Sequence, residues 1–158
     1  MTLHIWNKLM KDKRFKYHAF ISNNANDRQW ARMLAQRLRK EGLRIFDEDS
    51  IMLGEDIVRS IESGIRSSRH VILVLTPGAV SSEWVTLELS VSLYRDPRSA
   101  ARTLIPVLRQ DCEIPLTLQR LKYLDARSED FEEQFRSLLR AIDLSAVDEP
   151  QTEGINYA

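Results

Sequence analysis

A tryptophan and a glutamate, Trp84 and Glu88, have the spacing in this chain that best suits chemistry. They lie four positions apart, which places both side chains on one face of a helix. The neighbouring residues are mostly apolar, and a carboxylate in apolar surroundings can stabilise a developing positive charge. The alternative is a glutamate that is solvated or paired with an arginine, such as Arg69 or Arg95.

Other reactive groups are poorly supported by the sequence. Cys112 is the single cysteine and has no histidine near it in sequence, so a quiet thiol is the simpler interpretation. Asp47 and Asp49 could bind Mg²⁺ as in receiver domains, but Thr76 stands where such a site needs a further aspartate. No metal site is expected, because no two of the three histidines have ligand spacing.

Phosphate-binding glycine loops are also missing from the sequence. Asn23 to Asn26 stand where a Gly-x-Gly-x-x-Gly loop would follow the first strand. A dinucleotide-binding oxidoreductase and a P-loop NTPase are therefore disfavoured, and no cofactor is expected.

The elements that must position these residues follow from the hydrophobic periodicity. Alternating or continuous apolar runs predict strands, and apolar residues three or four apart predict helices. We expect Asn26 to cap the first helix with Gln29 as its capping-box partner, and Gly42 to end it. Pro106 predicts an edge position or a bulge for its strand. The predicted strands are 17–22, 43–46, 71–75, 103–108 and 121–124, and the predicted helices are 27–41, 57–65, 84–94 and 131–142.

Strands that alternate with helices predict a doubly wound α/β domain with helices on both faces of a parallel sheet. The run 71–75 is apolar throughout, which is typical of a central strand. Right-handed connections bring the loops 22–27, 47–56 and 76–83 to one edge of the sheet, where ligands bind in such folds.

Length and charge restrict the function further. The 158 residues suit one domain, and 23 basic residues balance 23 acidic ones, which disfavours direct nucleic-acid binding. The balance is uneven, because residues 1–40 carry a net charge of +8 and residues 129–158 one of −6. No apolar run is long enough to cross a membrane, no secretory signal is evident, and one cysteine suits the cytoplasm.

Several segments together resemble the Toll/interleukin-1 receptor (TIR) domain family, over roughly residues 15–142. Two positions depart from the usual family pattern: Asn23 replaces a tyrosine or histidine, and Leu53 replaces a proline before a glycine. The matching segments are Phe20-Ile21-Ser22 with the Trp30 helix, 42–47 with the BB loop at 54–57, the strand 71–75, and Ser82-Glu83-Trp84 with Glu88.

The resemblance implies a flavodoxin-like, five-stranded parallel sheet and a specific reaction. Enzymatic members of the family cleave NAD⁺ at the nicotinamide–ribose bond, giving ADP-ribose or a cyclic variant, and the matching catalytic residue is Glu88. One carboxylate suffices, because nicotinamide is a cationic leaving group that departs neutral and needs no general acid. NAD⁺ is then the substrate and not a cofactor.

The remaining candidate site residues lie at the expected sheet edge. Ser22 and Asn23 offer hydrogen bonds to the substrate, and the helix that follows them favours its diphosphate. Phe46 faces the substrate ring or packs in the core, and Trp84 walls the site or packs on the sheet. Two BB-loop residues, Asp49 and Ser50, contact the substrate or a second copy.

The resemblance also implies domain boundaries and alternative functions. We expect an N-terminal extension at 1–14, a TIR domain at 15–143 and a flexible tail at 144–158. The family implies self-association, a sensor partner and a role in anti-phage defence or as an effector. The rivals are a non-enzymatic TIR–TIR scaffold and a nucleoside deoxyribosyltransferase-like enzyme with a glutamate nucleophile.

Overall fold

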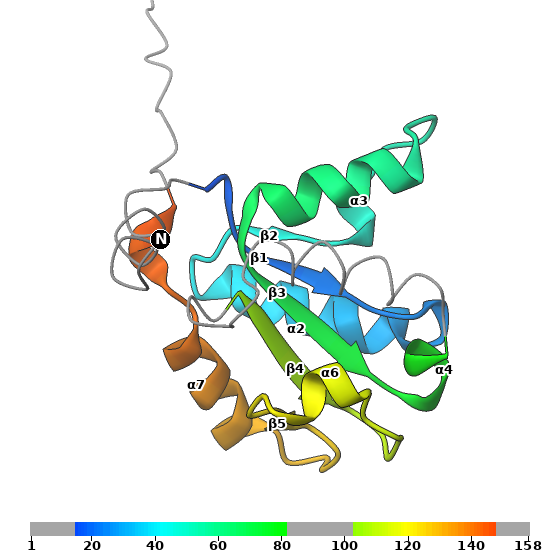
Figure 1. Cartoon of the computed structure of the whole chain (residues 1–158). Helices are drawn as coiled ribbons and strands as arrows, with labels where there is room; N and C mark the ends of the chain where they lie inside the picture. Colours follow the sequence, from blue (N-terminus) through cyan, green and yellow to red (C-terminus); the bar gives the residue numbers. More distant parts are fainter. Residues whose placement is uncertain (1–14, 82–102, 148–158) are drawn as a thin grey trace, which may run out of the picture.

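The protein is built on one parallel five-stranded sheet, seen in a computed structural model that describes residues 15–81 and 103–147. The strand order is β2-β1-β3-β4-β5, so the chain steps outward from β1 in both directions (Figure 1). This order confirms the flavodoxin-like α/β fold. The strands are β1 (Tyr17–Ser22), β2 (Ile45–Phe46), β3 (Ser68–Leu75), β4 (Leu104–Leu108) and β5 (Leu124–Asp125).

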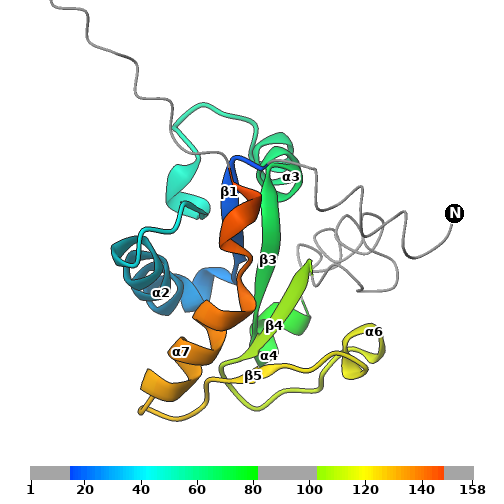
Figure 2. The ribbon, with the colours of Figure 1, turned by 90° about the vertical axis from the view of Figure 1, so that its left-hand side faces the viewer.

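Helices cover both faces of the sheet (Figure 2). On one face lie α2 (Arg28–Lys40) and α7 (Glu132–Ala141), and on the other lie α3 (Ile57–Arg66), α4 (Pro77–Val80) and α6 (Leu116–Gln119). Three 3-10 turns complete the described elements: η1 (Ala25–Asp27), η2 (Glu48–Ser50) and η3 (Leu144–Ala146). The short helices α4 and α6 were not predicted, because four residues carry no periodic signal.

The central strand β3 supplies both halves of the core. All eight of its residues are buried, and the continuous apolar run 71–75 is typical of such a strand. The strand begins three residues before the predicted start, at Ser68. Ile72 and Val74 pack with the residues of α2 and α7, whereas Val71 and Leu73 pack with those of α3 and α4. Alternate side chains of one strand therefore hold both helical layers to the sheet.

The helix after β1 starts differently from the sequence prediction. Asn26 does not cap it: η1 comes first, capped by the Asn24 carboxamide, which accepts from the Ala25 amide at 2.8 Å. Asp27 occupies the N-cap position of α2 but makes no side-chain capping bond there. The end of the helix confirms the prediction, because Gly42 has a φ of +84°, a left-handed conformation that suits glycine.

Pro106 was expected to mark an edge strand or a bulge, yet β4 lies between β3 and β5. The Thr103 carbonyl and the Arg109 amide bond to β3, so odd-numbered residues face β3 and even-numbered residues face β5. Pro106 therefore turns its missing N–H away from β3. Pairing with β5 starts only at Val107, beyond the proline, which explains how an interior strand accepts it.

The segment that follows α7 packs at the end of the sheet where β1 and β3 begin. The Asp143 amide donates to Nε2 of His70, a fully buried residue of β3, at 3.0 Å. Val147 forms a parallel bridge with Phe15, beside the start of β1. Residues 144–147 thus belong to the fold, although the sequence assigned them to a flexible tail, 144–158.

Three predicted segments lie outside the described residues: the extension 1–14, the helix 84–94, and the rest of the tail. Among the helices of 15–81 and 103–147, none has the length and apolar character needed to span a bilayer.

His18 makes the stability of this fold depend on pH. Its Nδ1 accepts a hydrogen bond from the Arg44 amide at 2.9 Å, and burial lowers its pKa against the raising effect of a hydrogen bond with the Leu144 backbone. The folded protein therefore binds this proton less readily than the unfolded chain, whose histidine titrates near about 6.5. We expect the free energy of unfolding to fall as the pH drops from 7.5 through this range.

Urea unfolding of the wild type and of His18→Asn at pH 7.5 and 5.5 measures the effect. The asparagine carbonyl can still accept from Arg44 but does not titrate, so the variant should lose less stability on acidification. An equal loss in both proteins would contradict the assignment to His18.

Candidate functional site

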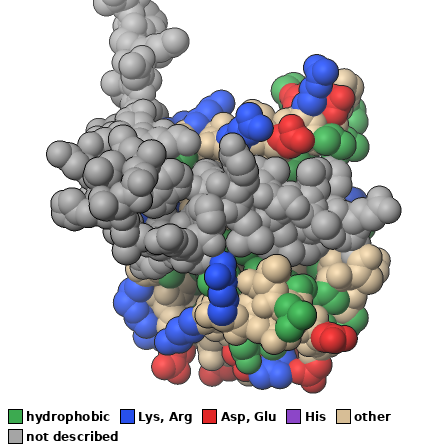
Figure 3. Space-filling model, in the orientation of Figure 1, with side chains coloured by type: hydrophobic (Ala, Val, Ile, Leu, Met, Phe, Trp, Pro, Cys, Tyr) green, Lys and Arg blue, Asp and Glu red, His purple; other side chains and the backbone are tan. Residues whose placement is uncertain are grey.

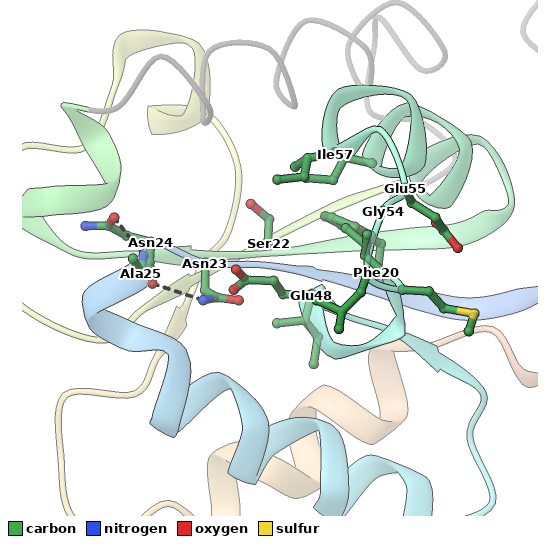
Figure 4. Close-up of a pocket in the computed structure, with 14 residues that line it drawn as sticks. Phe20, Ser22, Asn23, Asn24, Ala25, Glu48, Gly54, Glu55 and Ile57 are labelled. Carbon is green, nitrogen blue, oxygen red and sulfur yellow. Dashed lines mark hydrogen bonds between the residues drawn. The ribbon is translucent and has the colours of Figure 1, made fainter.

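A cleft opens at the carboxyl end of β1, between the β1–α2 loop and the β2–α3 loop (Figure 4). Its volume is about 470 Å³, within the range of small-molecule sites. This is the edge of the sheet at which the fold class predicts a ligand. The lining residues are Phe20, Ile21, Ser22, Asn23, Asn24, Ala25, Glu48, Ile51, Met52, Leu53, Gly54, Glu55, Ile57 and Ile61.

The hydroxyl of Ser22 is the most informative group in the cleft. Ser22 is the last residue of β1 and is only 2% exposed, yet its Oγ has no hydrogen-bond partner among the described residues. Figure 4 shows this hydroxyl pointing into the cleft. A buried polar atom without a partner costs about 1–3 kcal/mol, so its placement suits a group that enters from outside.

The β1–α2 loop is fastened to the loop after β3. The Thr76 hydroxyl donates to the Asp27 carboxylate at 2.7 Å and accepts from the Ala79 amide at 3.3 Å. Gly78 lies directly against Asn24, and a Cβ at this glycine would overlap the carboxamide nitrogen. These contacts fix the wall of the cleft that carries Asn23 and Asn24.

The opposite wall, the β2–α3 loop, is tied to α2 by ion pairs. All three arginines come from α2, and all three carboxylates follow β2 directly. The pairs are Arg28 with Glu48 at 2.8 Å, Arg32 with Asp49 at 2.5 Å, and Arg39 with Asp47 at 3.2 Å.

Each ion pair fixes position more than it adds stability, because most of these side chains are half-exposed to solvent. The hydrogen bond from Arg32 lowers the pKa of Asp49. Of the three carboxylates, only that of Glu48 lines the cleft.

The structure brings two of the predicted site residues together, Ser22 and Asn23. Phe46 instead packs on Tyr17 and Phe20, with ring centroids at 5.3 and 5.6 Å, and fills the space above Gly64. The core role that the sequence left open for Phe46 is the one observed.

The two BB-loop candidates also point elsewhere. Asp49 pairs with Arg32 on the surface, and the Ser50 hydroxyl donates to the Asp47 carboxylate at 3.0 Å in a capping box. Neither residue lines the cleft. Trp84 and Glu88, which carry the predicted chemistry, lie outside the described residues.

Sequence reasoning missed Glu48 and the apolar wall of the cleft. A run of three acidic residues directly after the second strand, with Glu48 at its centre, was a usable signal for Glu48. Apolar residues inside a polar loop were another, because Met52 and Leu53 are 72% and 106% exposed. With Ile57 and Val58 they form an apolar patch, the loop patch, which Figure 3 shows beside charged side chains at the outer end of α3.

Metal and thiol chemistry find little support in the described part of the chain. Within residues 15–81 and 103–147, no three His, Cys, Asp or Glu side chains converge as ligands of a metal ion. Burial and the nearby Asp111 carboxylate raise the pKa of the Cys112 thiol, which disfavours the reactive thiolate.

Replacing Ser22 tests whether its hydroxyl supports the fold. Ser22→Ala removes no hydrogen bond within residues 15–81 and 103–147, so the free energy of unfolding should stay unchanged or rise by up to about 1 kcal/mol. Thr76→Val removes two hydrogen bonds, one of them to the Asp27 carboxylate, so it should cost about 1–3 kcal/mol. Urea denaturation of both variants measures the contrast, and a clear loss of stability in Ser22→Ala would show a structural role.

Comparison with known proteins gives the family. The family model described as the TIR domain matches residues 19–139, which include the whole cleft. A solved structure, the TIR domain of the Toll-related receptor TRR-2 from Hydra magnipapillata, superposes with a TM-score of 0.69 at 26% identity. The match covers 79% of this chain and 97% of that one.

The similar curated proteins fall into two groups. NAD(+) hydrolase TcpA of Theionarchaea archaeon is 35% identical over 98 residues, and 2′ cyclic ADP-D-ribose synthase AbTIR of Acinetobacter baumannii is 26% identical over 98. Each match covers 61% of this chain. Human Toll-like receptor 1 is 33% identical over 120 residues, 73% of this chain.

These matches span 30%, 36% and 15% of the three relatives' own lengths, in that order. The strand order, the cleft and the match over 121 residues agree with one another. The chain belongs to the TIR domain family.

Proposed function

We propose that this TIR domain cleaves NAD⁺ at the nicotinamide–ribose bond, giving nicotinamide and ADP-ribose or a cyclic ADP-ribose. The observation that carries the proposal is the cleft at the carboxyl end of β1, with a buried Ser22 hydroxyl that has no partner among the residues the structure describes. Relatives named as an NAD(+) hydrolase and a cyclic ADP-D-ribose synthase support the choice of substrate.

Glu88 is the proposed catalytic residue, because it lies four positions after Trp84, as in the family's enzymatic members. The C1′–N bond breaks with its electron pair moving to nicotinamide, which leaves as a neutral molecule. The carboxylate of Glu88 stabilises the positive charge that develops on the ribose. Water then adds at C1′ and releases a proton, or a hydroxyl of the same nucleotide adds and closes a ring.

The cleft residues have binding roles in this proposal. The Ser22 hydroxyl and the Asn23 carboxamide hydrogen-bond the substrate, the amino end of α2 favours its diphosphate, and Trp84 walls the site. Phe46 and Ser50 support the cleft from behind through the contacts described above, whereas Asp49 pairs with Arg32 on the surface, outside the cleft. The cytoplasmic location, a sensor partner and a role in defence remain predictions.

Glu88→Gln tests the reaction directly. The substitution keeps the shape of the side chain but removes the charge, so nicotinamide release should fall about 100-fold or more, the scale expected when a charge-stabilising group is lost. Glu133→Gln makes the same change on the exposed surface of α7 and should behave as the wild type. Equal release by wild type and Glu88→Gln, assayed with concentrated protein and NAD⁺, would exclude the glutamate.

An interaction module is the second candidate, favoured by the loop patch and by the Toll-like receptor relatives. Scaffold contacts through this loop, or between the basic residues of 1–40 and the acidic residues of 129–158, would give assemblies without NAD⁺ turnover. The deoxyribosyltransferase alternative would instead show turnover of deoxynucleosides in preference to NAD⁺.

Two surface variants distinguish self-association through the loop patch from self-association through charged segments. Leu53→Glu places a charge in the loop patch and should lower self-association, whereas Leu116→Glu changes another highly exposed leucine, on α6, and should not. Sedimentation velocity at low and high salt measures both, since salt disperses charge-driven contacts but not apolar ones. Assembly that is unaffected by Leu53→Glu would remove the loop patch from the interface.

A further inference from the structure

Two polar residues, Ser22 at the end of β1 and Glu48 in the β2–α3 loop, line opposite sides of the cleft, and we call them the polar pair. We propose that this pair binds the vicinal hydroxyls of a ribose, and that Glu48 thereby determines the substrate specificity of the site. The inference rests on the proposed function, because NAD⁺ carries two such riboses.

Glu48 is held with its acceptor capacity only partly used. Nε and Nη2 of Arg28 donate to its two carboxylate oxygens at 3.1 and 2.8 Å. A carboxylate offers about four lone-pair positions, so each oxygen can accept one more hydrogen bond. The side chain is 48% exposed and points into the cleft toward the end of β1 (Figure 4).

The chemistry of the pair selects neutral donors. An ionised carboxylate only accepts hydrogen bonds, so it favours hydroxyls and repels phosphates and carboxylates. Ser22 adds a hydroxyl that both donates and accepts, and it has no partner among the described residues. Two neighbouring hydroxyls satisfy both sides at once, which is the arrangement on a ribose.

The position of Glu48 in the fold agrees with this role. β2 pairs with β1 at Ala19 and Phe20, and Glu48 follows the last residue of β2 by two positions. In doubly wound dinucleotide-binding folds, an acidic residue one strand away from the phosphate loop binds a ribose hydroxyl. The two folds share this position of an acidic residue by topology alone. The position of Glu48 supports a ribose site separately from the Ser22 hydroxyl.

The ion pair next to Arg28–Glu48 provides a control for the role of Glu48. Arg32 and Asp49 form the same kind of two-bond pair from α2 to the same turn, but outside the cleft. If Glu48 served only to tie the loop to α2, breaking either pair would have the same effect.

Calorimetric binding of NAD⁺ in a Glu88→Gln background tests the proposal without turnover. The probes are NAD⁺ and two analogues, each lacking the 2′-hydroxyl of one ribose, and they distinguish which ribose is bound. The parent should bind one analogue about ten-fold more weakly than NAD⁺. Adding Glu48→Gln or Ser22→Ala should weaken NAD⁺ and reduce that discrimination, whereas adding Arg32→Gln should leave both unchanged.

Three outcomes would overturn the inference: equal binding of all three probes by the parent, discrimination that survives Glu48→Gln, or the same loss in Arg32→Gln. Wild-type protein that binds NAD⁺ with this selectivity but releases no nicotinamide would overturn the proposed function alone. Absence of NAD⁺ binding would overturn both.

Discussion

The whole architecture depends on the burial of β3. A strand with all eight residues buried must find hydrogen bonds on both edges and apolar cover on both faces. β1 and β4 meet the first need, and the helical layers of α2 with α7 and of α3 with α4 meet the second. Because the strands are parallel, the loops after β1, β2 and β3 then emerge at one edge, where the cleft lies.

The loops around the cleft are fixed by polar contacts, since they lie outside the apolar core. The hydrogen bond between Thr76 and Asp27 joins the loop after β3 to the loop after β1, and the arginines of α2 hold the β2–α3 loop. Against this background of paired groups the unpartnered hydroxyl of Ser22 stands out. A buried hydroxyl that finds no partner among the described residues directs attention to what enters the cleft.

Periodicity in the sequence was enough for long elements such as β1 and α3, because their burial repeats over several residues. In β3 it identified the apolar residues 71–75 but not the first three residues, which are buried and polar. It was insufficient where tertiary contacts decide. β5 has two residues and lies at Leu124–Asp125, not at 121–124, because its pairing with β4 sets its position. The Asn26 cap was wrong because η1 forms first and Asn24 caps it. Glu48, which lines the cleft, is held by Arg28, a residue 20 positions away in sequence that local periodicity does not connect to it.

The bridge between Phe15 and Val147 has a mechanical consequence. The two segments run parallel, so tension applied to the chain on either side of the described fold pulls them in opposite directions along their length. Such a load acts in shear, and the bond from Asp143 to His70 shares it. The cleft lies at the other end of β1, outside this line of force. Pulling on both ends of the chain therefore strains the Phe15–Val147 bridge and the Asp143–His70 bond, while the cleft keeps its geometry.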